Sequence, residues 1–410
     1  MKGFKASLFF LILFFVFFPF VGVVKNIDVQ PNFVVFSFFA LCFFIRYIKV
    51  DFLFFCFFVF LCIVFCLSLV FGYYYINIIY VITYFVVLLN VFFLYVFIKN
   101  DFFNITSKNI FLFVFVYAVV GIIQYYDPNF MSWAVTRSQE AMLSFSESGR
   151  GVRSLASEPA TLGKMFNVFN ILLIILIHTE NKVSESKKTA FGLVVTVVIL
   201  LLNITIARSA YAVGIQFVFV VCYLFVFYKK TFFVGFVLCV CVFSFILRYI
   251  SDMQSYRIAQ IFYIAFSDPS LLLEQGAVRR LLNIPISINN LYYFGFLGAN
   301  NNPNVYYASL YTPFGELDYL ASNRNLGGFI EWLLKFGLFG IPMMLLYLFF
   351  IFSMLRYCVI IENKKYWIGL YFFIATFFIT FQDGSPTAPF TWFILFFIYF
   401  TLKKKFLRFF

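Results

Sequence analysis

The sequence predicts an all-α polytopic membrane protein, and three observations lead to that fold class. Apolar residues make up 64% of the 410-residue chain and the mean hydropathy is +0.98, whereas soluble domains contain about 45–50% apolar residues. Apolar runs of about 15–20 residues recur along the chain, and runs of that length are typical of membrane-crossing helices. Basic residues gather at alternate ends of these runs, as the positive-inside rule requires. We therefore expect a single integral membrane domain over residues 1–410.

About twelve transmembrane helices are expected. The first apolar run follows Lys2 and Lys5 and has no small-residue cleavage site after it, so we expect a retained span and not a cleaved signal peptide. Several of the other runs are short and need flanking Tyr or Trp residues to cross about 30 Å. The expected spans lie near 6–24, 31–46, 52–70, 78–98, 110–125, 160–178, 190–206, 211–228, 232–250, 334–355, 366–381 and 389–402.

The distribution of basic residues predicts that both termini are cytoplasmic. With the N-terminus placed inside, 18 of the 30 basic residues fall at cytoplasmic ends of spans, whereas the four short external loops contain only Lys25 and Arg208. The net charge of +13 therefore reflects topology. Because the basic residues are spread over seven cytoplasmic segments, with no cluster in one domain, a nucleic-acid partner is not expected.

Two long loops are expected on the external side, at residues 126–159 and 251–333. Loops of this length within a compact domain are usually functional. The second loop contains the turn-rich stretch GANNNPN at 298–304. It also contains two segments, 253–266 and 269–283, with arginines embedded in apolar faces. Such a pattern suits helices that lie at the membrane surface.

The external segments are rich in arginine, whereas lysine dominates the cytoplasmic ends. The planar guanidinium presents paired donors and binds phosphate groups in a bidentate way. For any single arginine, snorkelling or pairing with a loop carboxylate is the alternative interpretation. The candidate anion-binding residues are Arg150, Arg153, Arg208, Arg257, Arg279, Arg280 and Arg324.

Arg208 lies in NITIARSAYAVG (203–214), a tight joint between two apolar runs. A charge held this close to the membrane needs a partner and is a candidate functional residue. Ser209 and Tyr211 are the nearest residues that could help to hold it. Interfacial snorkelling is the alternative.

Glu158 and Pro159 fall where the first long loop re-enters the membrane. Proline is well tolerated in the first turn of a helix, so a helix is expected to begin here, capped by Ser157 or Glu158. Beyond this structural role, Glu158 could orient Arg153 or accept a proton from a substrate hydroxyl.

Motifs for nucleotides and metals are missing from the sequence. There is no GxxxxGK[ST], no HExxH and no D-x-D pair in the external loops. The single histidine, His178, stands at the cytoplasmic end of an expected span, and we expect it to be structural. The eight cysteines lie in or beside apolar runs, which suits small packing residues better than disulfides or metal ligands. The sequence therefore predicts neither a metal site nor a cofactor.

Three segments resemble elements of the bacterial O-antigen polymerases (Wzy-type) and their capsule and exopolysaccharide counterparts. RSLASEPATLG (153–163) is similar to the R-x-x-x-x-E-P-[SA] element of that family, and IARSAY (206–211) is similar to its arginine-containing joint. NRNLGGFIEWLLKFGLFG (323–340), which includes Arg324 and Asn325, resembles the stretch that enters a late span. The resemblance covers most of the chain by topology and these three segments by motif.

The resemblance implies a membrane-embedded glycosyltransferase fold of the GT-C kind in the bacterial inner membrane. Its implied substrates are undecaprenyl-diphosphate-linked oligosaccharides on the periplasmic face, with a chain-length regulator protein as a further partner beside the membrane lipids. The growing glycan would pass from its lipid diphosphate to a sugar hydroxyl of a new repeat unit, without a cofactor. The residues expected to act in catalysis are Arg153, Glu158, Arg208, Arg279 and Arg280, and those expected to bind substrate are Arg150, Arg257, Arg324 and Asn325.

Two other functions are weighed against this one. A lipid-linked oligosaccharide flippase or other transporter could also have twelve spans, but it would be expected to have short loops and charges within several spans. It would also be expected to have internal repeats, and none is visible between the two halves of the sequence. An O-antigen ligase-like transferase is expected to have a histidine in the second long loop, and this loop has none.

Overall fold

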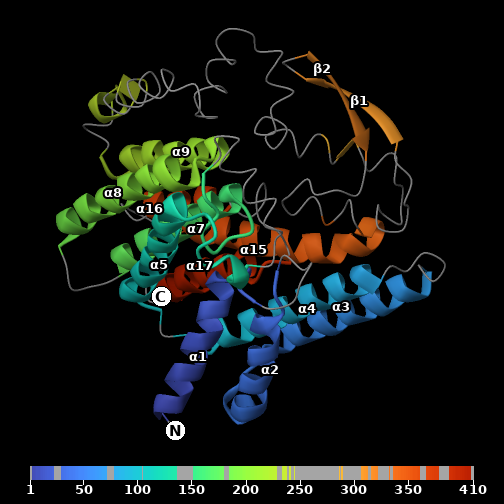
Figure 1. Cartoon of the computed structure of the whole chain (residues 1–410). Helices are drawn as coiled ribbons and strands as arrows, with labels where there is room; N and C mark the ends of the chain where they lie inside the picture. Colours follow the sequence, from blue (N-terminus) through green and yellow to red (C-terminus); the bar gives the residue numbers. More distant parts are fainter. Residues whose placement is uncertain are drawn as a thin grey trace.

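The structure, a computed structural model, is predominantly helical (Figure 1). It describes residues 2–22, 29–71, 78–103, 105–135, 151–179, 184–228, 233–237, 240, 241, 244, 286, 288, 289, 306–312, 315–321, 332, 336–360, 366–377 and 387–407.

Helices account for most of the described residues. The α-helices are α1 (Lys2–Phe17), α2 (Asn32–Phe44), α3 (Phe52–Phe71), α4 (Ile78–Lys99), α5 (Ser107–Tyr126), α7 (Pro159–Thr179), α8 (Glu185–Leu202), α9 (Ala210–Phe227), α15 (Ile341–Ile360), α16 (Tyr366–Phe377) and α17 (Pro389–Leu407). The shorter elements are η1 (Ile45–Tyr47), η2 (Ser132–Ala134), the π-helical turn η3 (Asn203–Ala207) and η6 (Gly337–Gly340), with strands β1 (Tyr306–Thr312) and β2 (Gly315–Ala321).

Six helices in the described part of the chain are long and apolar enough to cross a membrane. They cover Phe52–Val70, Val81–Lys99, Ser107–Tyr126, Pro159–Thr179, Ser186–Ala207 and Gly337–Tyr357, and shorter apolar helices cover Gly3–Phe17, Asn32–Tyr47 and Tyr211–Phe227. The expectation of an apolar, helical membrane protein is met at this level. The expected span at 232–250 lies largely outside the described residues.

Two sequence-based expectations need correction. The first span was expected over residues 6–24, but α1 ends at Phe17, because proline at position 19 disfavours helical backbone in the residue before it. Val21 instead pairs with Val135 in an antiparallel β-bridge. The all-α expectation also missed a β-hairpin in the second long loop, where β1 and β2 pair antiparallel from Tyr306 with Ala321 to Thr312 with Gly315.

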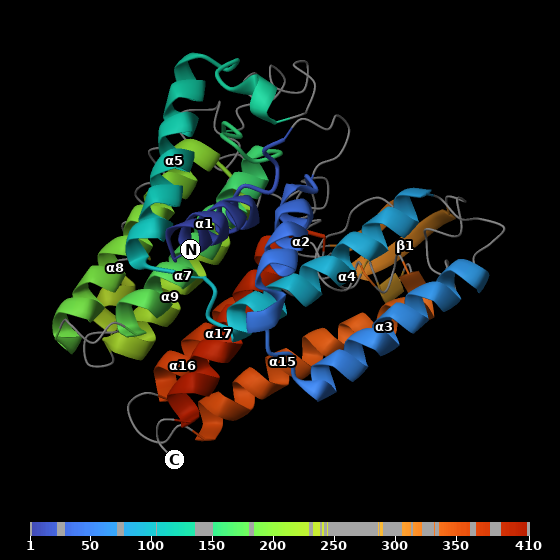
Figure 2. The same ribbon diagram turned by 90° about the horizontal axis from the view of Figure 1, so that it is seen from below.

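Helix α7 forms the centre of the bundle. It packs against α5, α8, α9, α16 and α17, and nearly all of its residues from Met165 to His178 are buried. Figure 2 shows α7 among α5, α8 and α9, with α3, α4 and α15 forming a second group of helices. His178, at the end of α7, joins three helices: its Nε2 lies 3.1 Å from the hydroxyl of Tyr223, which donates to the carbonyl of Thr189 at 3.0 Å. This contact fits the structural role expected for His178.

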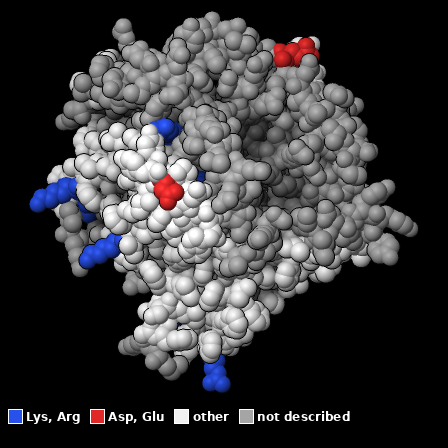
Figure 3. All heavy atoms as spheres, in the orientation of Figure 1, with Lys and Arg blue, Asp and Glu red and all other residues white. Residues whose placement is uncertain are grey.

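The flanks of the bundle expose large apolar side chains. Phe38, Phe39 and Phe43 are exposed on α2, and Phe52 and Leu53 are exposed at the start of α3. On the face shown in Figure 3, most of the described surface is uncharged, and the described Lys, Arg, Asp and Glu side chains are few. Exposed apolar surface of this extent is costly in water and favourable in lipid.

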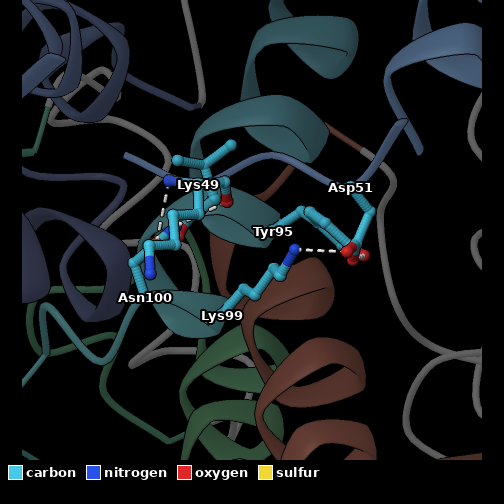
Figure 4. Close-up of polar contacts among 6 residues, drawn as sticks. Lys49, Asp51, Tyr95, Lys99 and Asn100 are labelled. Carbon is cyan, nitrogen blue, oxygen red and sulfur yellow. Dashed lines mark hydrogen bonds and ion pairs between the residues drawn. The ribbon is translucent and has the colours of Figure 1, made fainter. Parts of the chain in front are cut away.

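Polar contacts join the segment before α3 to the end of α4 (Figure 4). Lys99, at the end of α4, forms an ion pair of 2.5 Å with Asp51, which also accepts a hydrogen bond of 2.7 Å from Tyr95. The Lys99 ammonium holds the pKa of Asp51 below its usual value, although partial burial opposes this effect. Asp101 forms a further ion pair with Lys404 of α17. The contacts therefore connect the α2–α3 joint with the ends of α4 and α17.

Candidate functional site

The joint between α8 and α9 has an unusual backbone. Helix α8 widens into the π-helical turn at Asn203–Ala207, and Arg208 follows with left-handed dihedrals, φ 46° and ψ 36°. Ser209 then caps α9, because its hydroxyl accepts the backbone N–H of Ala212 at 3.4 Å. Single π-turns and left-handed non-glycine residues both recur at functional sites. The tight joint expected around Arg208 is thus present, with Arg208 at its apex.

The guanidinium of Arg208 is partly exposed and lies against the end of α5. Its Nη2 donates to the hydroxyl of Tyr125 at 3.0 Å, and its Cζ lies 4.9 Å from the centroid of the same ring. Its Nε donates to the carbonyl of Thr205 at 3.3 Å. Tyr125, at the end of α5, is thus a partner of this cation that the sequence did not suggest.

The re-entry segment, which we define as residues 151–158, packs directly on this joint. The backbone N–H of Val152 donates to the carbonyl of Ile206 at 3.1 Å. A Cβ at Gly151 would collide with the carbonyl oxygens of Ile206 and Ala207, so the close approach requires glycine. The last carbonyls of a helix lack an intrahelical partner, and the bond from Val152 supplies a partner to that of Ile206.

Arg153 belongs to this segment and is buried, with only 4% of the residue exposed. Its Nη2 reaches the carbonyls of Ser132 and Val135, each at 3.4 Å. The next residue, Ser154, donates its hydroxyl to the carbonyl of Tyr117 at 2.7 Å. The backbones near Arg153 and Arg208 thus meet, while their guanidinium groups are directed to different partners. Arg153 lies where it ties the re-entry segment to the 132–135 turn.

Glu158 stands at the N-cap of α7, as the sequence suggested. Helix α7 begins at Pro159, and the carbonyl of Glu158 accepts the first helical bond from the N–H of Leu162 at 3.0 Å. Ser157 donates its hydroxyl to that of Thr161 at 3.3 Å. The Glu158 side chain is partly exposed beside the positive end of the helix, where a carboxylate is favoured.

Other expected site residues lie outside the described part of the chain. They are Arg150, Arg257, Arg279, Arg280, Arg324 and Asn325, together with the expected surface helices 253–266 and 269–283. Among the described residues, no group of three or more His, Cys, Asp and Glu side chains is placed to bind a metal ion, and the described cysteines are free thiols.

Two residues at the site were not anticipated from the sequence. Tyr125 holds Arg208, and its only sequence signal was its place among the aromatic residues at the end of an expected span. Asn167 lies within α7 and hydrogen-bonds the joint from below. A buried amide in an otherwise apolar span could have been singled out, because polar groups within membrane helices usually bridge to other helices.

Comparisons of the chain with protein-family models, with curated proteins and with solved structures each find no match.

Proposed function

We propose that this chain is a polysaccharide polymerase of the bacterial inner membrane, with both termini in the cytoplasm and about twelve spans in a GT-C-like arrangement. It joins undecaprenyl-diphosphate-linked oligosaccharide repeat units on the periplasmic face. In this arrangement the re-entry segment and the joint at Arg208 form the external lip of the site.

One observation carries the proposal. The segments that resemble the polymerase family, 153–163 and 206–211, are separated in sequence by more than forty residues but pack against each other in space. Val152, at the edge of the first segment, bonds to Ile206 at the start of the second. Gly163, at the end of the first, lies against Ser209 of the second. Motifs that meet at one place, with a partly exposed arginine at its edge, support a shared site.

The chemistry suits an arginine site. The oxygen of an acceptor sugar hydroxyl attacks the anomeric carbon of the donor glycan, and the bond from that carbon to the diphosphate oxygen breaks. The lipid diphosphate leaves with the bonding electron pair, and the hydroxyl proton passes to a base, for which Glu158 is the candidate, or to water. Negative charge therefore develops on the diphosphate, where a preorganised cation stabilises the transition state. Orientation of the acceptor hydroxyl supplies a further part of the rate.

Purified protein in liposomes that contain lipid-linked repeat units tests this function. We expect longer lipid-linked glycans, and one undecaprenyl diphosphate released for each new glycosidic bond. Repeat units that cross the bilayer without becoming joined would instead identify a flippase. Transfer that occurs only to a lipid A-core acceptor would identify a ligase-like enzyme.

A further inference from the structure

The amide of Asn167 bridges both sides of the segment that carries Arg208. Asn167 is 2% exposed, in the interior of α7. Its Oδ1 accepts a hydrogen bond of 2.8 Å from Nδ2 of Asn203, the first residue of the π-turn. Its Nδ2 donates to the carbonyl of Ala212 in the first turn of α9, at 3.2 Å. Both hydrogen-bonding groups of this one amide are thus used, on either side of Arg208.

Helix α7 is also shaped to receive this segment. A Cβ at Gly163, one turn before Asn167, would lie 3.2 Å from Oδ1 of Asn203 and 3.5 Å from Cβ of Ser209, and would collide with Ala212. Helix α7 therefore comes close to the joint at Gly163, and one turn later the amide of Asn167 forms hydrogen bonds with it. Since neither group touches the guanidinium, their effect on Arg208 is exerted through the backbone between Asn203 and Ala212.

Arg208 needs such support because its backbone is in the left-handed region, which costs free energy for a residue with a Cβ and persists only where the surroundings impose it. Asn167 of α7 bonds to the joint at Asn203 and Ala212. Val152 of the re-entry segment adds a third bond, to Ile206. The guanidinium then takes up a fixed place on Tyr125. A preorganised cation binds an anion with less ordering cost than a mobile one.

We infer that Asn167 is a positioning residue for Arg208: its amide fixes the spacing of the π-turn and α9 so that the guanidinium is held ready for a diphosphate group. The identity of the anion rests on the proposed function, whereas the positioning of Arg208 by Asn167 does not.

Hydrogen exchange tests the positioning without any ligand. In lipid nanodiscs, Asn167→Leu is expected to raise amide exchange at residues 203–212 by about tenfold or more, because local opening becomes easier. The matched control is Asn170→Leu, the same change one turn along α7 at a residue that is also fully buried, and it should leave exchange there within about twofold. Asn203→Ala removes one of the two bonds and provides a milder variant if Asn167→Leu does not fold. Unchanged exchange at 203–212 in both Asn167→Leu and Asn203→Ala would overturn the inference.

A double-mutant cycle then tests whether Asn167 acts through Arg208. With farnesyl diphosphate as the probe, Asn167→Leu should weaken binding about tenfold when Arg208 is present and less than about twofold in an Arg208→Ala background. Equal weakening in both backgrounds would show that Asn167 does not act through the arginine. If Arg208→Ala binds the probe as tightly as the unmodified protein while exchange responds as expected, the positioning stands and the proposed diphosphate site is the part that fails.

Discussion

The guanidinium of Arg208 rests on the ring of Tyr125, with Nη2 3.0 Å from the phenol oxygen and Cζ 4.9 Å from the ring centroid. Arg208 lies in the joint between α8 and α9, and Tyr125 lies in the last turn of α5, 83 positions away in the sequence. One side of the cation is thereby covered by an aromatic ring. Tyr125 thus helps to hold the Arg208 guanidinium in place at the joint.

Two substitutions of Tyr125 should therefore slow polymerisation to different degrees. Tyr125→Phe keeps the cation–π contact and loses one hydrogen bond, so we expect a fall of less than about tenfold in rate. Tyr125→Ala removes both contacts and should have the larger effect. The rate of glycan elongation in liposomes is the measurement, and Tyr126→Phe is the control, because it removes the same hydroxyl from the neighbouring residue. Full activity of Tyr125→Ala would contradict the role given to this ring.

Arg153 is expected to affect stability as well as activity. Its buried guanidinium holds the carbonyls of Ser132 and Val135, and Arg153→Ala leaves them without this donor, at a cost of about 1–3 kcal/mol. Thermal unfolding in detergent should show a lower Tm for Arg153→Ala, whereas Arg208→Ala should unfold near the temperature of the unmodified protein. A normal Tm for Arg153→Ala together with lost activity would point instead to the direct substrate contact that the sequence suggested.

Two glycine substitutions should have opposite effects. Gly151→Ala forces a Cβ into the carbonyls of Ile206 and Ala207, and backbone cannot move aside as a flexible side chain can, so we expect about 1–3 kcal/mol of destabilisation. Gly214→Ala adds a Cβ on α9 with nothing within 4 Å, and should stabilise the helix by about 0.5–1 kcal/mol. Thermal unfolding of both variants provides the comparison. Equal stability of the two would show that the re-entry segment does not pack on the joint.

The ion pair between Asp51 and Lys99 should make stability depend on pH in acid. The pKa of Asp51 is lowered in the folded protein by its hydrogen bond from Lys99. The stabilisation is therefore present above the ordinary pKa of 3.8 and is lost as the pH falls through the lower folded-state pKa. Since the Asp51 side chain is 47% exposed, the contribution is at most about 1 kcal/mol. Unfolding of Asp51→Asn between pH 2 and pH 7 should lack this component, and an unchanged pH profile would refute it.

Features that depend on neighbouring residues were accessible from the sequence. The start of α7 at Pro159 and the joint at Arg208 followed from local composition, and both are confirmed. Pro19 also indicated a helix end, but it lies within a continuous apolar run, and the expected span was therefore extended past the end of α1 at Phe17. The pairing of β1 with β2 was missed, because two seven-residue segments within a long loop give only a weak sequence signal for strands.

Features that depend on distant residues were not accessible. The contact of Arg208 with Tyr125 and the bond from Val152 to Ile206 join segments that only the packing of α5, α7 and α9 brings together. The burial of Arg153 has the same origin, because an arginine in a long loop gives no sign of which carbonyls will enclose it. The sequence could identify Arg153 and Arg208 as candidates, and only the fold could show which groups each guanidinium contacts.

The glycan ladder made by the Arg208→Ala variant is the most direct measurement. In a strain that lacks its own polymerase, with protein abundance checked in the membrane, Arg208→Ala should shorten the ladder severely, because removing a preorganised donor costs about 3–4 kcal/mol, or about 10²–10³ in rate. Arg208→Lys should rescue it poorly, since lysine lacks the planar fork, and Arg137→Ala, outside the matching segments, should leave it complete. A full ladder from Arg208→Ala at normal abundance would contradict the account and place the diphosphate site elsewhere.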